Sequence, residues 1–405
     1  MKLFPITLAI DTSCDETAAA VTCGLEVWSN IVASQTELHK PYGGVFPTVA
    51  KLAHQENIEK TVVAALQRGH IQPSEIEQIA VTIGPGLAPA LEVGIGYAQK
   101  LAKELDVPLI PINHVEAHLL SCHVLQRPIN KWQGLTIEKK RAGQHTQQYW
   151  QTINLPALGI IVSGKHTAFV QVGESGRHTE HSRSTTPFDS VFNCIQPDIA
   201  QGDSATIDRI PGLRLNNQDN LPWLNSKIFH YTILGQTVDD AAGEALDKLG
   251  RLLNLGYPAG PVIEELAKKG NAKKYPLPLP MTESKNFNLS FSGLKTYTRN
   301  FIEKEWGHTP PNKQEVYDLA ASIQYAVFRH ICNKLDKILL AKKTYSNFDQ
   351  VWLGGGVAAN ATLRSMLRQT LKKNKITAKL LTPANNKLCG DNAGMIGIVA
   401  APALT

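Results

Sequence analysis

Short apolar runs alternate along this chain with longer segments whose apolar residues recur every three or four positions. The run ITLAI at residues 6–10 is typical of a buried strand, and IAVTIG and VPLIPI predict two more. Helices are expected over about residues 54–68 and in GIGYAQKLAKEL. The apolar face of the first helix is formed by Ile58, Val62, Val63 and Leu66. This alternation favours an α/β domain with a largely buried sheet.

The pattern starts again in the second half of the chain, where LGIIVSG and AFVQVG read as strands. Helices are expected near residues 241–253 and 316–341. The segment QVWLGGGVAAN then combines a strand, a glycine turn and a helix start, and a last helix follows near the C-terminus. Because each half opens with a strand and a hairpin, we expect a duplicated architecture.

Two stretches interrupt the pattern, and both read as insertions because structureless loops of this length are uncommon inside compact domains. Residues 127–156 carry five Lys or Arg against one Glu, with Trp132, Tyr149 and Trp150 interleaved. Residues 173–230 are rich in Ser, Thr, Asn, Asp and Gly. The first stretch is either a solvated excursion or an RNA contact, with cations on phosphates and aromatic rings on bases.

The composition is that of an ordinary globular protein, with 43% hydrophobic and 19% charged residues. A net charge of +6 permits a nucleic-acid partner without requiring one. The six cysteines form no C-x-x-C pair, which argues against a cysteine zinc site and fits a reducing cytoplasm. The N-terminal apolar run ends at Asp11 without a signal-peptide cleavage site, and no apolar stretch is long enough to span a bilayer. We therefore expect a cytoplasmic protein with no membrane partner.

The segment PINHVEAHLL places His114 and His118 four residues apart, so that on a helix both imidazoles can reach one ion. Asn113 is a good N-cap, and Glu116 is expected to complete a capping box by reaching back to the Asn113 N–H. The spacing differs from the H-E-x-x-H of zinc proteases. The alternative is a pair of polar residues at a helix start.

A third metal ligand is offered by Asp391 in KLCGDNAGMIG, although this residue could instead cap the helix that follows. Two histidines and one carboxylate leave coordination positions open for a substrate. Such sets suit iron(II), and zinc in some sites.

Four glycine-rich loops, at residues 84–94, 161–167, 256–261 and 354–360, can bring backbone N–H groups close to phosphate. None matches the P-loop or the dinucleotide-binding fingerprint. Together with DTSCDET after the first strand they predict a nucleotide held between two lobes. In DDAAGEALDK, acidic residues gather at a helix start, where the helix dipole explains some of them. Asp247 lies deeper and could bind a ribose hydroxyl.

About ten segments stand in the order in which the TsaD family has them, so the chain resembles that family of tRNA-modifying enzymes over residues 6–122, 158–172 and 231–399. The segments are DTSCDETAAAV, YGGVFP, GPGLAPALEVG, NHVEAHLL, VSGKHT, DDAAGEALDK, GYPAGP, SFSGLKT, GGGVAANATLR and CGDNAGMI. The resemblance implies an α/β, actin-like, duplicated two-lobe fold with a ligand cleft between the lobes. The lobes are expected at residues 1–122 and 158–405, with a basic insertion at 123–157 and a loop-rich one at 173–230.

The resemblance also implies an activity. A threonylcarbamoyl group passes from threonylcarbamoyl-AMP to N6 of adenosine 37 in tRNAs that read ANN codons, and AMP is released. The partners implied are tRNA, a non-catalytic paralogue subunit and a small P-loop ATPase. One divalent metal is implied, iron(II) first and zinc second. The implied metal ligands are His114, His118 and Asp391. The implied substrate contacts are Ile161, Val162, Ser163, Gly164, Lys165, Asp247, Gly260 and Asn360.

The chain departs from the family pattern in a few places. Lys165 replaces a usual glycine, and its side chain would either crowd the pocket or place a charge on phosphate. Ala259 and Gly390 are milder replacements. The sequence shows no convincing Ser-His-Asp or Cys-His set, and the reaction requires no side-chain nucleophile, so we expect direct attack by the RNA amine. The sequence does not identify a general base. The alternatives are an actin-like small-molecule kinase, a metalloprotease and a non-catalytic scaffold.

Overall fold

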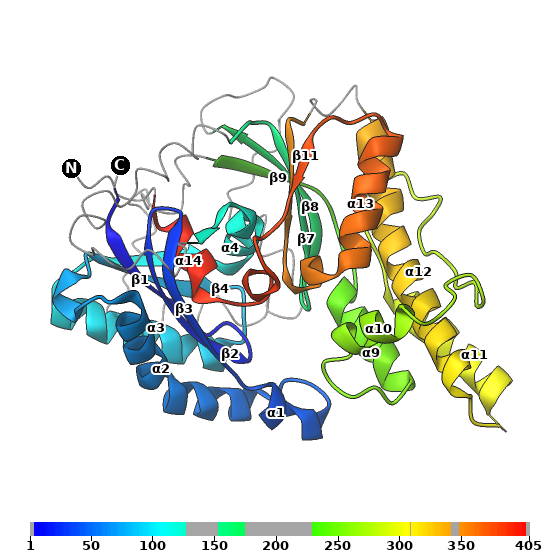
Figure 1. Ribbon diagram of the computed structural model, residues 1–405, viewed down its shortest axis with the longest axis horizontal. Coiled ribbons are helices and arrows are strands. Elements are labelled where there is room, and N and C mark those ends of the chain that lie inside the picture. Colours follow the sequence, from blue (N-terminus) through cyan, green and yellow to red (C-terminus); the bar gives the residue numbers. More distant parts are fainter. Residues whose placement is uncertain (1–3, 127–152, 175–228, 308, 342–347, 402–405) are drawn as a thin grey trace.

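Two mixed β-sheets form the centres of two lobes that lie side by side (Figure 1). The computed structural model describes residues 4–126, 153–174, 229–307, 309–341 and 348–401. The expected RNA contact of the basic insertion, and nearly all of the loop-rich insertion, lie outside these residues.

The first sheet has the strand order β5-β4-β1-β2-β3-β6. Its strands are β1 (Ile6–Asp11), β2 (Glu16–Cys23), β3 (Glu26–Ser34), β4 (Gln78–Gly84), β5 (Leu109–Asn113) and β6 (Leu125–Gln126). The first three strands form an antiparallel meander, β4 runs parallel to β1, and β5 runs parallel to β4.

The second sheet has the order β11-β10-β7-β8-β9. Its strands are β7 (Ala157–Val162), β8 (Thr167–Glu174), β9 (Phe229–Gln236), β10 (Gln350–Gly354) and β11 (Lys379–Leu381). Again the first three strands form an antiparallel meander, β10 runs parallel to β7, and β11 runs parallel to β10. The repeated order and direction of the strands confirm the expected duplicated, actin-like α/β fold.

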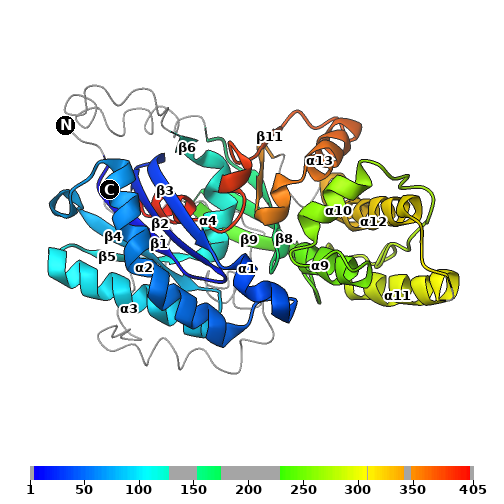
Figure 2. The same ribbon diagram turned by 60° about the horizontal axis from the view of Figure 1, so that its bottom comes forward.

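The two faces of the first sheet are covered by different helices, as the alternation of side chains along β1 requires. Leu8 and Ile10 pack in the core beneath α2 (Pro47–Gly69) and α3 (Ala88–Leu105). Ala9 packs on the other face, with residues of α4 (His114–Leu120) and α14 (Ala393–Val399). The two helix pairs are seen on opposite sides of the sheet (Figure 1, Figure 2). The last helix therefore returns to the first sheet, where small alanine side chains let it approach closely.

The helices of the second lobe surround a larger core. They are α9 (Ala242–Leu252), α10 (Gly260–Ala267), α11 (Ser292–Trp306), α12 (Lys313–Leu340) and α13 (Ala361–Lys373). Helix α12 begins with a capping box between Asn312 and Glu315 and is buried along most of its length. A short helix, α1 (Thr36–His39), is followed by the 3-10 turn η1 (Lys40–Tyr42). Other short 3-10 turns include η3 (Ser121–His123), η5 (Gly356–Ala359) and η6 (Asn386–Leu388).

The predicted first helix is longer and its buried face narrower than the sequence suggested. Helix α2 begins at Pro47, where proline is favourable because the first N–H groups of a helix lack partners. Ile58 and Val62 are buried, but Val63 is 46% exposed, so its inclusion in the apolar face was wrong. In the described segments, no helix has the length and hydrophobicity that a membrane crossing requires.

His330 makes the stability of the second lobe sensitive to acid. The imidazole is buried on α12, and its Nε2 accepts the backbone N–H of Ser290 at 3.2 Å, which requires a neutral ring. Burial, reinforced by Lys334 and Lys337 and opposed by Asp239, lowers the pKa of His330 to about 4.

We expect the free energy of unfolding to fall as the pH drops from about 6.5 toward 4, by up to about 3 kcal/mol. In that window the unfolded chain binds a proton that the folded chain does not accept. The variant His330→Gln keeps an acceptor and cannot titrate, so its stability should depend less on pH. Urea denaturation of both proteins at several pH values measures the difference. Parallel curves would show that His330 is not the group responsible.

Candidate metal centre

The two histidines of α4 owe their positions to the residue that precedes the helix. Strand β5 ends at Asn113, whose side-chain oxygen accepts the backbone N–H of Val115 at 2.9 Å and of Glu116 at 3.2 Å. This cap confirms the predicted start of the helix. His114 and His118 are therefore one turn apart on a short buried helix, on one face.

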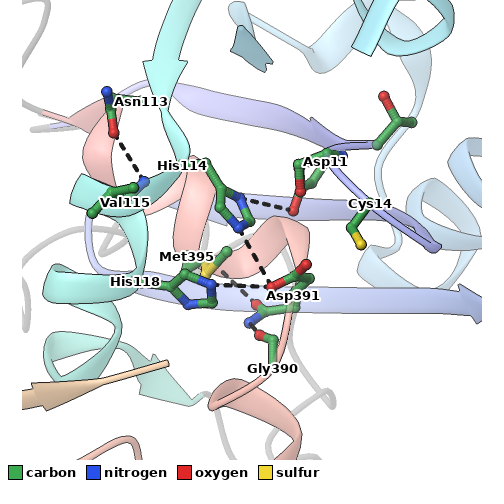
Figure 3. Close-up of polar contacts among 12 residues, drawn as sticks. Asp11, Cys14, Asn113, His114, Val115, His118, Gly390, Asp391 and Met395 are labelled. Carbon is green, nitrogen blue, oxygen red and sulfur yellow. Dashed lines mark hydrogen bonds and ion pairs between the residues drawn. The ribbon is translucent and has the colours of Figure 1, made fainter. Parts of the chain in front are cut away.

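Asp391 comes to the same point from the loop before α14 (Figure 3). Its Oδ1 lies 3.0 Å from Nε2 of His118 and 3.4 Å from Nε2 of His114. One ligand atom from each of the three residues lies within 4.8 Å of the other two. Asn392, and not Asp391, caps α14, since its side chain accepts the Met395 N–H at 3.1 Å. The Asp391 carboxylate is thus available, and the three residues form a candidate site for one divalent metal.

Charge at this centre favours a cation. Burial alone would raise the pKa of Asp391, but His114 and His118 hold it well below its usual range. The carboxylate is therefore ionised. Burial alone would lower the pKa of His114, but Asp391 and Asp11 raise it.

Asp11 lies behind His114 and was missed by the sequence analysis as an individual residue. Its Oδ2 is 3.6 Å from Nδ1 of His114, on the side away from Asp391 (Figure 3). A carboxylate behind a ligating imidazole fixes the orientation of the ring. The sequence did contain a signal for Asp11, since it is the last residue of a buried strand. Ligands of α/β proteins bind at the carboxyl ends of strands.

His166 is a second residue that the sequence did not single out. The side chain is 1% exposed, and neither ring nitrogen has a hydrogen-bond partner among the described residues. Its ring centre lies 6.4 Å from that of His114. Burial, and then His114 and His118, lowers the pKa of His166 well below its usual range, so the ring is neutral. Buried polar groups without partners are rare, and this one adjoins the metal centre.

The loop between β7 and β8 is held in shape by Ser163, whose hydroxyl accepts the N–H of His166 at 2.9 Å and of Lys165 at 3.3 Å. The side chains of Ile161 and Val162 are fully buried in the core. Of the five expected substrate contacts in this loop, only Gly164 and Lys165 reach the surface.

Lys165 is half-buried in the loop between β7 and β8, and its ammonium group interacts with Cys14 and Asp391. Burial alone would lower the pKa of Lys165, but a hydrogen bond to the Cys14 sulfur and the charge of the Asp391 carboxylate raise it. The side chain thus places a positive charge beside Asp391. For Cys14, burial raises the pKa well above its usual value despite the nearby lysine, so the thiol stays protonated.

The other expected substrate contacts have structural partners of their own. Oδ1 of Asp247 accepts the N–H groups of Ala259 at 2.7 Å and Gly260 at 3.2 Å, which fixes the turn before α10. Asn360 caps α13 by accepting the Thr362 N–H at 2.9 Å, and its amide donates to Gln324.

Other acidic residues of DDAAGEALDK are also engaged. Asp239 accepts the hydroxyl groups of Ser290 and Ser292 and the Phe291 N–H at the start of α11. Lys248 pairs with both Asp240 and Glu244. These pairings explain the acidic residues more directly than the helix dipole does.

The predicted capping box at α4 was wrong in its second half. Glu116 does not reach back to Asn113; its carboxylate accepts the hydroxyl of Tyr231 in β9 at 2.8 Å. Burial raises the pKa of Glu116 to about 7. The bond ties the helix that carries both histidines to the second sheet.

The sequence of the chain was compared with protein families and with individual proteins, and both comparisons point to the same family. The family model for TsaD, tRNA N6-adenosine threonylcarbamoyltransferase, matches residues 26–131 and 220–398. Proteins of that name from Clostridioides difficile and Trichlorobacter lovleyi are 36% and 35% identical to the chain. Each alignment covers 97% of this chain, with 91% of the first relative and 90% of the second.

Among solved structures, HypF from T. kodakarensis aligns with a TM-score of 0.49 and 15% identity, over 97% of this chain and 47% of that chain. A ROK family glucokinase from Streptomyces griseus aligns with a TM-score of 0.41 and 11% identity, over 98% of this chain and 99% of that chain.

Proposed function

The chain belongs to the TsaD family of tRNA N6-adenosine threonylcarbamoyltransferases, and we propose that its donor is threonylcarbamoyl-AMP. The acceptor is N6 of adenosine 37 in tRNAs that read ANN codons, and AMP leaves. The observation that carries this proposal is the convergence of two histidines and one carboxylate from segments far apart in the sequence. The protein works in the cytoplasm, with a non-catalytic paralogue subunit and a small P-loop ATPase as partners.

His114, His118 and Asp391 hold one divalent metal, and the donor set favours iron(II), with zinc as the second choice. A metal with open coordination positions supplies Lewis-acid polarisation of the donor carbonyl. Asp11 keeps the His114 ring in the orientation that points Nε2 at the site. His166, which is neutral and whose ring nitrogens have no hydrogen-bond partner among the described residues, exchanges a hydrogen bond with the bound donor in this proposal.

The adenylate lies along the backbone of the loop at Ile161, Val162, Ser163 and Gly164. Lys165 adds a positive charge for the phosphate. On the second lobe, Asp247, Gly260 and Asn360 border the nucleotide. Holding the donor in this way lets a weakly basic exocyclic amine attack directly, since positioning replaces much of the entropic barrier.

A covalent enzyme intermediate is not part of the proposed mechanism. The Cys14 thiol, which is drawn in the close-up of the centre (Figure 3), is 8% exposed and protonated, and a protonated thiol is a poor nucleophile. The spacing of the histidines differs from that of zinc proteases. A kinase would need a base beside an acceptor hydroxyl and usually binds Mg²⁺ without a histidine pair.

The test is a reconstituted transfer. The purified chain is mixed with threonylcarbamoyl-AMP, an unmodified tRNA that reads an ANN codon, and the two partner subunits, and nucleosides are analysed by mass spectrometry. We expect threonylcarbamoyladenosine and an equal amount of AMP.

For Lys165→Ala we expect a higher KM for the adenylate with little change in kcat. Absence of product from folded, metal-loaded protein with all partners would refute the proposed reaction, and a trapped acyl-enzyme would refute direct attack.

A further inference from the structure

One short region of the chain carries positive charges and no negative ones. Residues 361–390 contain seven Lys or Arg and no Asp or Glu, while the whole chain has a net charge of +6. The cations are Arg364, Arg368, Lys372, Lys373, Lys375, Lys379 and Lys387. The net charge of this segment, +7, is as large as that of the whole chain, and the other residues together are close to neutral.

The segment folds into α13, a turn and the edge strand β11, and a groove of about 630 Å³ lies between them. Its cationic lining is Arg368, Lys372, Lys375 and Lys379, and its apolar lining includes Leu371, Ile376 and Leu380. All four cations are exposed, and among the described residues none of them forms an ion pair.

The remaining cations of the segment show what structural roles look like here. Lys373 pairs with Asp336 at 2.8 Å. Arg364 donates to the carbonyl oxygen of Ala358 and to the Cys389 sulfur. A lysine at the last turn of a helix, or on an edge strand, has a stabilising role by itself. Lys372 lies in the last turn of α13 and Lys379 on the edge strand β11, so these roles can explain both. They do not explain Arg368 and Lys375, which line the same groove.

The groove is connected to the candidate site through both of its elements. Helix α13 begins next to Asn360 and, with 13 residues, is about 20 Å long. After β11 the chain passes through η6 directly to Asp391. Figure 1 shows the C-terminal end of α13 and strand β11 together at the top of the second lobe, while α11 forms its outer end.

We propose that this groove, formed by the C-terminal end of α13, the following turn and β11, binds the sugar–phosphate backbone of the tRNA substrate at a distance from the adenosine that is modified. The identity of the RNA rests on the proposed function. Unpaired cations on an exposed surface release counterions when they contact phosphates, and this supplies affinity without reading sequence. The apolar lining accommodates the uncharged faces of the sugars.

An RNA fits this surface better than an acidic protein does. In the proposed function the candidate site binds one adenylate and one base of the tRNA. A large polyanion such as tRNA therefore needs a second binding surface elsewhere on the protein. The groove has cations on both sides and no acidic residue in its lining, so it can contact several successive phosphates of one strand. A positive patch also complements an acidic patch on a protein, so the test below includes loss of a protein subunit as an outcome that would overturn the proposal.

The test compares two double charge reversals of equal net charge. The groove variant carries Lys372→Glu and Lys375→Glu, and the control carries Lys103→Glu and Lys304→Glu, two exposed lysines in the last turns of α3 and α11. The Kd for unmodified tRNA is measured by fluorescence anisotropy at several salt concentrations. For the groove variant we expect binding about tenfold weaker and a salt slope smaller by about two, with the control close to wild type.

Transfer kinetics distinguish this proposal from the proposed function. We expect a raised KM for tRNA in the groove variant and an unchanged KM for the adenylate. A groove variant with the Kd and salt slope of the control would overturn the proposal, even if product still forms. Groove-dependent binding of tRNA without product would leave the groove in place and reject the proposed reaction. Loss of a protein subunit from the groove variant, with tRNA binding intact, would assign the surface to an acidic protein and also overturn the proposal.

Discussion

His118→Ala is expected to lose bound metal and at least about 10²-fold in kcat/KM for threonylcarbamoyl transfer. Removing a residue that only orients a ligand typically costs about 10–100-fold in metal affinity or activity, so removing the ligand itself costs more. The imidazole is 1% exposed, and its Nε2 lies 3.0 Å from Asp391 Oδ1. Water can replace one ligand, but it cannot restore the fixed geometry of the set.

Two further variants test whether the loss of metal depends on the charge of Asp391 and on the carboxylate behind His114. Asp391→Asn keeps the shape of the side chain and removes its charge, so it should lose metal almost as completely as His118→Ala. Asp11→Asn changes only the group behind His114, and we expect a smaller loss, about 10–100-fold. Metal content after dialysis, adenylate binding and nucleoside yield are measured for each protein.

Readdition of iron(II) or zinc to chelated wild-type protein then identifies the metal that supports transfer. The measured unfolding transitions must match that of the wild type for the comparison to hold. Full activity in a His118→Ala protein that contains no metal would reject the site.

Much of the fold was readable from the sequence because it depends on local patterns. The run ITLAI predicted β1, and its alternation explains why leucine and isoleucine meet α2 and α3 while Ala9 meets α14. Asn113 was predicted as a cap, since an N-cap acts on N–H groups two and three residues away. The repeat of strand and hairpin predicted the duplication.

The failures involve partners that are distant in the sequence. Glu116 was assigned to a local bond, but it bonds Tyr231, and a hydroxyl 115 residues away leaves no periodic signal. One open question was local: Asp391 and Asn392 are both good capping residues, and the structure shows that Asn392 caps α14. Asp11 and His166 matter through their distance to His114, which the sequence does not show because they come from the end of β1 and from the loop between β7 and β8.

Gly354→Ala is expected to destabilise the protein by about 3 kcal/mol or more and to weaken metal binding. A Cβ at Gly354, the last residue of β10, would press on the carbonyl oxygen of His118 and lie 2.7 Å from its carbonyl carbon. The effect comes from this close approach, since the backbone at Gly354 lies outside the left-handed region. Neither side can yield easily, because β10 is paired with strands on both edges and α4 is buried.

The metal is affected because the atom in contact belongs to a ligand residue. A shift of α4 away from β10 moves His118 relative to Asp391, which is held on the separate loop before α14. We therefore expect Gly354→Ala to bind metal more weakly even in the folded fraction, as measured by metal content after dialysis, and to unfold at a lower urea concentration.

Gly96→Ala is the matched control. Gly96 is exposed inside α3, and a Cβ there would meet nothing within 4 Å. The same substitution should therefore stabilise the protein, by about 0.5–1 kcal/mol, because alanine loses less backbone entropy in a helix. Opposite signs for the two variants would separate the close contact from any general effect of replacing glycine. A Gly354→Ala protein with wild-type stability and metal content would mean that α4 moves away from β10 without cost, so that this strand does not fix the position of the histidines.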